Sequence, residues 1–234
     1  MAAAHLVGDF LMQSPQMVRQ KGKLPVLLSH ASLLAALSYA ACGLWTLWQV
    51  PVVIFVTHAL IDFVKAKSGK SGAVAFLVDQ GAHGLVIALL AGAAADLTQA
   101  PPFWVGLLGP WYLKALVILS GAVACIRMGG YLIGAAVRPL QQKLLDLKSG
   151  PAQGSPDAGM IIGQLERALI FILTLTGQTA GIGFLIAAKS ILRFGEAQDP
   201  AQRMEAEYII IGTLMSFGWG ILISYLTAVL LQQV

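Results

Sequence analysis

Apolar residues form seven long runs along the chain, separated by short polar stretches. The runs cover residues 3–18, 24–43, 47–66, 73–97, 103–137, 160–190 and 206–232. A helix needs ~20 apolar residues to cross the hydrocarbon core of a bilayer. The pattern therefore predicts an all-α polytopic protein with about seven membrane segments. The first run is short for a full span, and 103–137 is either one long helix or a short element followed by a helix.

The longest polar stretch covers residues 138–158 and contains proline, glycine and charges of both signs. Such a composition breaks helices and is typical of a linker. We expect one membrane domain over 1–234, in which this linker joins a four-helix front half and a fifth segment, 103–137, to the last two helices over 160–234. Glu166 and Arg167 stand near the start of the sixth run, and we expect them to mark its interfacial end.

The composition agrees with a membrane protein. Hydrophobic residues make up 57% of the chain and charged residues 11%, whereas soluble domains carry about 25% charged residues. The net charge of +4 indicates loops that face an anionic lipid surface, and no nucleic-acid partner is expected. Cys42 and Cys125 lie inside apolar runs, so neither a disulfide nor a zinc–thiolate site is predicted.

Basic residues cluster after the first, third and fifth runs. The clusters are Arg19, Lys21 and Lys23, then Lys65, Lys67 and Lys70, then Arg138, Lys143 and Lys148. Loops rich in lysine and arginine stay in the cytoplasm. This asymmetry predicts an external N-terminus and a cytoplasmic C-terminus.

The front half contains an internal repeat. The pattern HxxxDF occurs at 5–10 and again at 58–63, and this offset of 53 residues also pairs His30 with His83. It thereby pairs all four histidines of the chain. Each copy, 1–44 and 54–97, would contain two helices, so both would enter the membrane in the same sense. We expect a four-helix bundle made of two parallel repeats with a pseudo-two-fold axis along the membrane normal.

The repeated histidines and aspartates have the spacing of a buried site. Three of the four histidines have an aspartate four residues away, which places both on one helix face. Their distance from the basic clusters puts these groups ~10–15 Å below the cytoplasmic surface, where ionisable groups must face the bundle interior. Imidazole and carboxylate together bind divalent transition metals, zinc above all. We expect one or two ions, and the predicted ligands are His5, Asp9, His30, His58, Asp62 and His83.

Two other interpretations of these groups remain open. The same residues suit a pathway for protons or ions, and they also suit a polar network that holds four helices in register.

Further polar residues receive predicted roles around this site. Asp79 has no counterpart in the first copy, where Val26 stands, and we predict that it is the general base. Lys65 shares a helix face with His58 and either holds a phosphate or extends to the membrane surface. Gln13 and Gln80 either orient ligands or bond between helices. In the back half, an interface anchor or a substrate gate would involve Lys189, Arg193 and Glu207.

Four motifs in this order, HLVGDFLMQ, a lone His30, HALIDFVK and DQGAH, carry a family resemblance. Over roughly residues 4–97 the chain resembles a bacterial integral-membrane family catalogued as domain of unknown function 3307. The resemblance implies the inner membrane of a bacterium and no established activity. A looser resemblance is to bacterial membrane-bound metal-dependent hydrolases, which also place histidine and aspartate at short spacings on helices.

These observations lead to three functional hypotheses. The first is a metal-dependent hydrolase embedded in the membrane near the cytoplasmic leaflet, acting on a lipid phosphate or a membrane peptide. The second is a transporter or channel for divalent metal ions or protons. The third is a membrane scaffold with a structural metal or a polar core.

Overall fold

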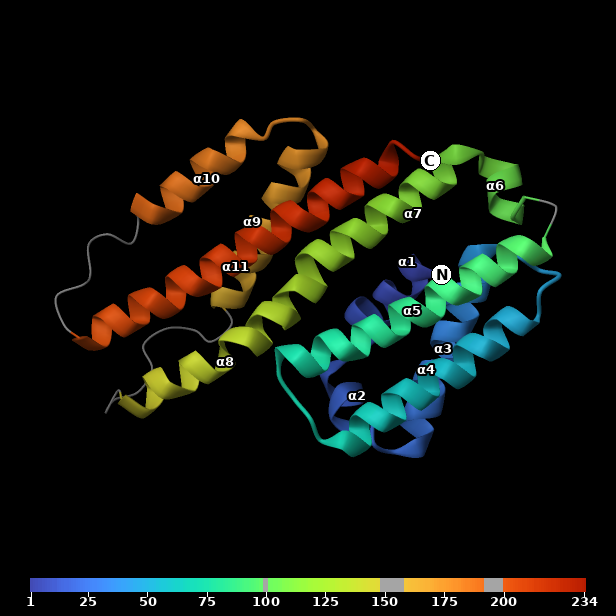
Figure 1. The fold of residues 1–234 in the computed structure, drawn as a ribbon, viewed down its shortest axis with the longest axis horizontal. Helices are drawn as coiled ribbons and strands as arrows, with labels where there is room; N and C mark the ends of the chain where they lie inside the picture. Colours follow the sequence, from blue (N-terminus) through green and yellow to red (C-terminus); the bar gives the residue numbers. More distant parts are fainter. Residues whose placement is uncertain (99–100, 148–157, 192–199) are drawn as a thin grey trace. The chain divides into compact units, whose positions relative to one another are not determined.

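The computed structural model describes residues 1–98, 101–147, 158–191 and 200–234, and every regular element in these ranges is a helix (Figure 1). The helices long and apolar enough to cross a membrane are Leu24–Cys42 (α3), Gln49–Ser68 (α4), Ala73–Leu97 (α5), Pro110–Leu144, Ala158–Leu175 (α9) and Glu207–Leu231 in α11 (Pro200–Leu231). Two shorter apolar helices, Ala2–Met12 and Ala180–Ser190, lie among them. The prediction of an all-α polytopic protein is confirmed.

The first predicted segment consists of several short elements. It contains helix α1 (Ala2–Val7), a π-helical turn η1 (Gly8–Met12) and helix α2 (Pro15–Gln20). The break follows from local chemistry, because Gln13 is extended and Ser14 caps α2 by accepting a hydrogen bond from the Met17 N–H. A proline at the first helical position then favours a new helix start.

The fifth and sixth predicted segments also divide. The fifth is a short helix α6 (Phe103–Leu108) followed by α7 (Pro110–Val123), a π-helical turn η2 (Ala124–Met128) and α8 (Gly129–Leu147). Helix α8 continues through Pro139, so the first part of the expected linker 138–158 is helical. The sixth predicted segment consists of two helices, α9, which ends at Leu175, and α10 (Ala180–Ile191). The chain turns between them at Gly177, which adopts a left-handed φ of 74°.

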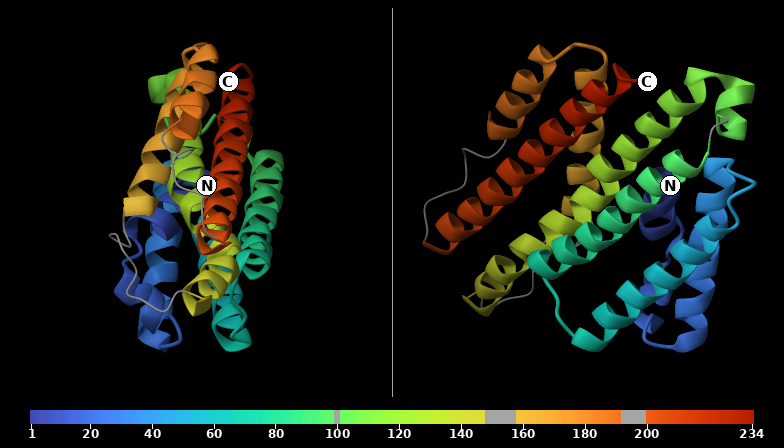
Figure 2. Two further views of the ribbon diagram at one scale, coloured as in Figure 1. Left: turned by 90° about the vertical axis from the view of Figure 1, so that its left-hand side faces the viewer. Right: turned by 45° about the vertical axis from the view of Figure 1, so that its right-hand side comes forward.

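The described chain forms two compact units, mainly Met1–Val123 and Ala124–Gln233. In the first unit α3 packs on α1 and α4, and α4 packs on α5. Helices α1 and α4 run in one direction, while α3 and α5 run in the other (Figures 1 and 2). The helices of 1–44 and those of 54–97 therefore run in the same order of directions, as a parallel repeat requires.

Close packing holds the short helix α1 against α3. A Cβ at Gly8 would collide with the side chain of Leu34, so only glycine permits this approach. The amino group of Met1 lies 3.6 Å from the sulfur of Cys42, the last residue of α3. Helix α1 therefore begins level with the C-terminal end of α3 and carries its polar residues down beside that helix.

In the second unit α11 packs on α8, α9 and η2, and α10 packs on α9. Its apolar core contains Ile170, Ile182 and Phe217. Arg167 lies halfway along α9 with 3% of its surface exposed. The expectation that it marks an interfacial end is wrong, because α9 begins nine residues earlier, at Ala158, and packing encloses its middle.

Candidate metal centre

The four histidines and three of the aspartates meet inside the first unit. His58 and Asp62 lie on α4, and Asp79 and His83 lie on α5. His5 lies on α1, and Asp9 lies on the adjoining turn η1. His30 comes from α3. All seven side chains are buried, none with more than 9% exposed. The sequence prediction that these groups share one interior location agrees with this geometry.

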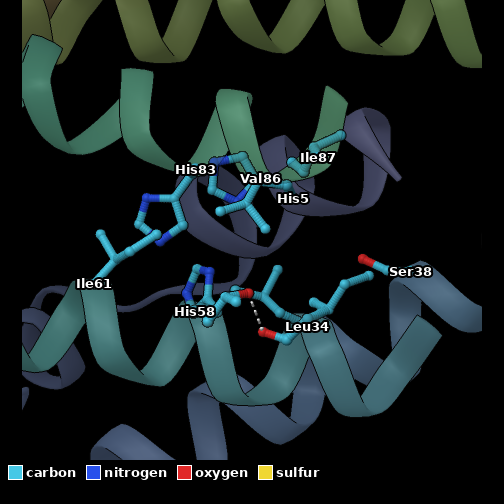
Figure 3. A pocket seen from close by; sticks show the side chains of 10 residues that line it. His5, Leu34, Ser38, His58, Ile61, His83, Val86 and Ile87 are labelled. Atoms are coloured by element: carbon cyan, nitrogen blue, oxygen red, sulfur yellow. Dashed lines mark hydrogen bonds between the residues drawn. The ribbon is translucent and has the colours of Figure 1, made fainter. Parts of the chain in front are cut away.

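The imidazole rings form a continuous cluster. The centroids of His58 and His83 are 4.4 Å apart, those of His5 and His83 are 4.8 Å apart, and those of His30 and His58 are 5.1 Å apart. Figure 3 shows the rings of His58 and His83 facing one another between α4 and α5, with His5 beside them. Each ring therefore lies within reach of at least one other.

Two carboxylates link the rings to one another. Asp9 accepts a hydrogen bond from His30 at 3.0 Å and lies 3.7 Å from His58 Nε2. Asp62 lies 3.3 Å from His58 Nε2 and 3.9 Å from His30 Nε2. Aspartates from both copies thus contact the same two histidines, which ties the copies together at their centre.

Three overlapping groups have donor atoms close enough to hold an ion. Within each group the nitrogen and oxygen atoms lie within 4.8 Å of one another. The groups are His5, Asp9 and His58; His30, His58 and Asp62; and Asp62, Asp79 and His83. Because neighbouring groups share His58 or Asp62, the arrangement suits adjacent ions or one ion with several supporting residues.

The contacts follow the sequence repeat. The offset of 53 residues exchanges His5 with His58 and His30 with His83. The ring contact of His5 with His83 is therefore equivalent to that of His58 with His30, and their centroid distances are 4.8 and 5.1 Å. This agreement in the folded chain supports the pseudo-two-fold relation that the sequence alone indicated.

Three polar residues of the second copy break this relation and contact one another. Asp79 Oδ2 accepts hydrogen bonds from Lys65 at 2.6 Å and from the Gln80 amide at 3.1 Å. The Gln80 side chain also contacts His5 at 3.3 Å and Asp9 at 3.4 Å. Their counterparts in the first copy are Met12, Val26 and Leu27. One side of the centre is therefore chemically distinct from the other.

Lys21 belongs to the site, although sequence reasoning placed it only in a basic loop. Its Nζ lies 2.7 Å from Asp62 Oδ2, and its side chain is 14% exposed. It stands between α2 and α3, and the fold of this connection directs it inward. Its position just before α3 resembled that of an ordinary charge at a membrane surface, so the sequence held no signal for this contact.

Several buried polar atoms of the centre make no hydrogen bond. They are His30 Nδ1, His58 Nε2, both oxygens of Asp62, Asp79 Oδ1 and His83 Nε2. Gln13 Nε2, from the residue predicted to orient ligands, is also buried without a partner. Asp62 Oδ2 and His58 Nε2 are close to charged partners, but these contacts lack hydrogen-bond geometry. Leaving such an atom buried without a partner costs about 1–3 kcal/mol. The concentration of these atoms in one place therefore calls for an additional group.

The tautomer of His83 favours a metal ligand. Its Nδ1 lies 2.9 Å from the backbone oxygen of Asp79. A carbonyl oxygen only accepts, so Nδ1 carries the proton and Nε2 keeps its lone pair. That Nε2 is buried without a hydrogen-bond partner. A backbone acceptor on the other ring nitrogen is the usual way in which proteins orient metal-binding histidines.

A small cavity adjoins the histidines. His5, His58 and His83 line one part of it, and the remaining lining comes from Leu34, Ser38, Ile54, Thr57, Ile61, Val86 and Ile87 (Figure 3). Its interior has room for about one water molecule. Mostly apolar side chains thus border the centre on this side.

The remaining predicted residues, Lys189, Arg193 and Glu207, stand in the back half of the sequence. Lys189 belongs to the second unit, where it pairs with Glu166 at 2.8 Å. Glu207 is exposed on α11, and Arg193 lies outside the described residues. Lys189 and Glu207 both belong to the second unit, and the role of the three residues as a gate stays a prediction.

Comparison with known proteins identifies one family. Residues 1–106 match the model of the family described as "Protein of unknown function (DUF3307)". This confirms the resemblance carried by the four motifs and extends it slightly at both ends. Neither the curated proteins nor the solved structures gave a significant match.

Proposed function

We propose, from the chemistry of the site, that the protein is a membrane-embedded, metal-dependent hydrolase. The family whose model matches residues 1–106 is described as of unknown function, so the proposal rests on the site. The observation that carries it is the set of buried imidazole and carboxylate atoms without hydrogen-bond partners. A divalent ion satisfies several of these atoms at once, and zinc suits a mixed histidine and aspartate set best. One or two ions fit the overlapping groups.

The chemistry follows from a bound ion and one free carboxylate. An ion held by these residues would lower the pKa of a water molecule and polarise the scissile bond. Asp79 Oδ1 is the proposed base, since Oδ2 is already bonded to Lys65 and Gln80. Water gives its proton to Asp79 and its oxygen to the scissile centre. The bond to the leaving group breaks with its electron pair, and the leaving group takes the proton back from Asp79.

The proposed location is the inner membrane of a bacterium, with the centre near the cytoplasmic leaflet. The basic residues of the 13–23 and 65–72 stretches support this side, because lysine-rich and arginine-rich loops stay cytoplasmic. On this assignment the N-terminus is external and the C-terminus cytoplasmic. Lipid phosphates and membrane peptides are the substrate classes that reach such a depth.

The test compares metal content with turnover. We expect full-length protein, purified without chelator, to carry one or two zinc ions per chain. Asp79→Asn should keep the ions, because asparagine has nearly the size of aspartate and the six predicted ligands are unchanged, but should abolish hydrolysis of lipid-extract or peptide substrates. Elemental analysis that finds no transition metal in the wild type would disprove the proposal. Loss of metal in Asp79→Asn would instead make Asp79 a ligand.

One observation favours metal or proton transport as a second candidate. Polar groups extend from Lys65 through the histidines to Thr57 and the buried Ser38 at the cavity, and such chains line ion pathways in membranes. The discriminating measurement is zinc or proton uptake into proteoliposomes. Saturable uptake that Asp79→Asn abolishes, without any hydrolysis product, would replace the hydrolase by a transporter.

A further inference from the structure

Two lysine side chains contact the candidate metal centre from the end of the basic loops. Lys21 Nζ lies 2.7 Å from Asp62 Oδ2, and Lys65 Nζ lies 2.6 Å from Asp79 Oδ2. Both aspartates belong to one group of candidate ligands. The two ammonium groups therefore stand beside the proposed ion, whereas the neighbouring Lys23 and Lys67 are exposed and make no such contact among the described ion pairs.

The centre would carry a net positive charge once a divalent ion binds. With neutral histidines, three carboxylates and two ammonium groups leave one net negative charge. One divalent ion turns this into one net positive charge, and two ions turn it into three. Uncompensated charge in a membrane interior is costly. A positive centre favours an anion. Each lysine ammonium has three donors, so Lys21 and Lys65 can bind that anion while they keep their contacts with Asp62 and Asp79.

The surroundings of the centre indicate what the rest of that anion is. Along α4, Ile54 lines the apolar cavity, His58 and Asp62 follow, and Lys65 comes last. Ile54 and Lys65 are eleven residues apart, or ~16 Å along a helix. The centre thus has a cationic end toward the basic loops and an apolar end toward the membrane interior, as a phosphate ester with an apolar remainder requires.

We infer that the loaded centre binds the phosphate group of an apolar phosphate ester between Lys21 and Lys65. Lysine binds phosphate as a point charge with three donors, and an ion held by Asp62, Asp79 and His83 would add positive charge beside them. This inference rests on the proposed metal centre and names its substrate class. Phosphate is the shared chemistry, and its source is either a lipid headgroup or the free anion.

The test measures binding to the zinc-loaded full-length protein in uncharged detergent. Inorganic phosphate, followed by titration calorimetry, is the first probe. Phosphatidylcholine nanodiscs with and without phosphatidic acid are the second, and tighter competition by phosphatidic acid would assign the lipid as the source. Lys21→Met and Lys65→Met should each weaken phosphate binding by roughly tenfold or more, while bound zinc stays constant. Lys21→Arg and Lys65→Arg should retain most of the affinity.

Matched controls stand two residues away from each lysine. Lys23→Met and Lys67→Met remove the same charge from the same loops, and each should change phosphate affinity less than twofold. Equal effects in test and control variants, or zinc-loaded protein that binds no phosphate, would overturn the inference and leave the metal centre standing. If wild-type protein purified without chelator contains no zinc, both this inference and the proposed metal centre are overturned. Constant zinc and a wild-type circular dichroism spectrum identify variants that have folded.

Discussion

The two units of the chain each bury a polar cluster, and the clusters differ in how well their members are satisfied. In the first unit seven ionisable side chains meet, and several of their nitrogen and oxygen atoms make no hydrogen bond. In the second unit the guanidinium of Arg167 donates to the Ile126 carbonyl and to the Ser216 hydroxyl. Both clusters are buried, so burial alone does not separate a binding site from a structural contact.

The environment of Arg167 is built to fit that one side chain. Ile126 lies in the π-helical turn η2, where the altered hydrogen-bond register leaves backbone carbonyls for other donors. A Cβ at Gly130 would lie 3.0 Å from the guanidinium, and one at Gly163 would lie 3.2 Å from it. Glycine at these two positions leaves room for the guanidinium, which a larger side chain would displace. We interpret Arg167 as a structural link between α9, η2 and α11.

The difference shows how unsatisfied atoms distinguish the two clusters. A structural network reaches its lowest free energy when every donor has an acceptor. The histidine cluster departs from that condition at several atoms, among them His30 Nδ1, Asp62 Oδ1 and His83 Nε2, and a bound ligand can satisfy them. Changes in the two clusters should therefore affect different observables: ligand content in the first unit and stability in the second.

The largest effect is expected from His58→Ala. His58 belongs to two of the three candidate ligand groups, so its removal should weaken zinc binding by roughly a thousandfold, about 4 kcal/mol. Competition with a chelator of known affinity measures the change. Thr57→Val, at the adjacent position, is the control and should keep its zinc. Unchanged zinc affinity in His58→Ala would make the first cluster a polar network like the second.

Arg167→Ala should come next, with a loss of about 3 kcal/mol. It leaves a cavity and removes the donors of the Ile126 carbonyl and the Ser216 hydroxyl. The thermal midpoint in detergent should fall, while the folded fraction keeps its zinc. Should the midpoint stay the same and the zinc disappear, the second cluster would belong to the functional site.

Gly8→Ala should cost about 2 kcal/mol, because the added methyl group collides with Leu34 and pushes α1 away from α3. Since α1 and η1 carry His5 and Asp9, zinc affinity should decrease together with the thermal midpoint. Gly81→Ala on α5, where a Cβ meets nothing within 4 Å, is the control: it should keep the zinc affinity and should not lower the thermal midpoint, because alanine favours a helix more than glycine does. Equal behaviour of the two variants would show that this helix contact does not position the centre.

Ser224→Ala should have the smallest effect. Its hydroxyl bonds the Gly220 carbonyl of the same helix at 2.6 Å, and the loss of one such bond costs about 1 kcal/mol or less. Thermal unfolding should show a small shift, and zinc content should stay the same. A large loss of stability would mean that the second cluster depends on its hydroxyl groups as much as on Arg167.

The sequence correctly predicted which histidines and aspartates lie together where their spacing matched the period of a helix. The spacing of His58 and Asp62, and its repetition at His5 and Asp9, predicted helix faces that the folded chain brings together. It failed for Lys21, because nothing in the local pattern distinguishes a lysine that turns inward from one that remains at the surface. It also failed for Arg167, whose depth depends on where α9 begins.

The sequence by itself determined that the chain is helical and crosses a membrane, since both follow from local hydrophobicity and length. It also indicated a repeat, because the same spacing of histidine and aspartate occurs at 5–30 and at 58–83. Only the tertiary structure decided that Lys21 contacts Asp62, that Asp79 is shared by Lys65 and Gln80, and that His83 keeps a free Nε2. These are contacts between residues distant in the chain or dependent on side-chain rotamers, and packing of several helices selects them.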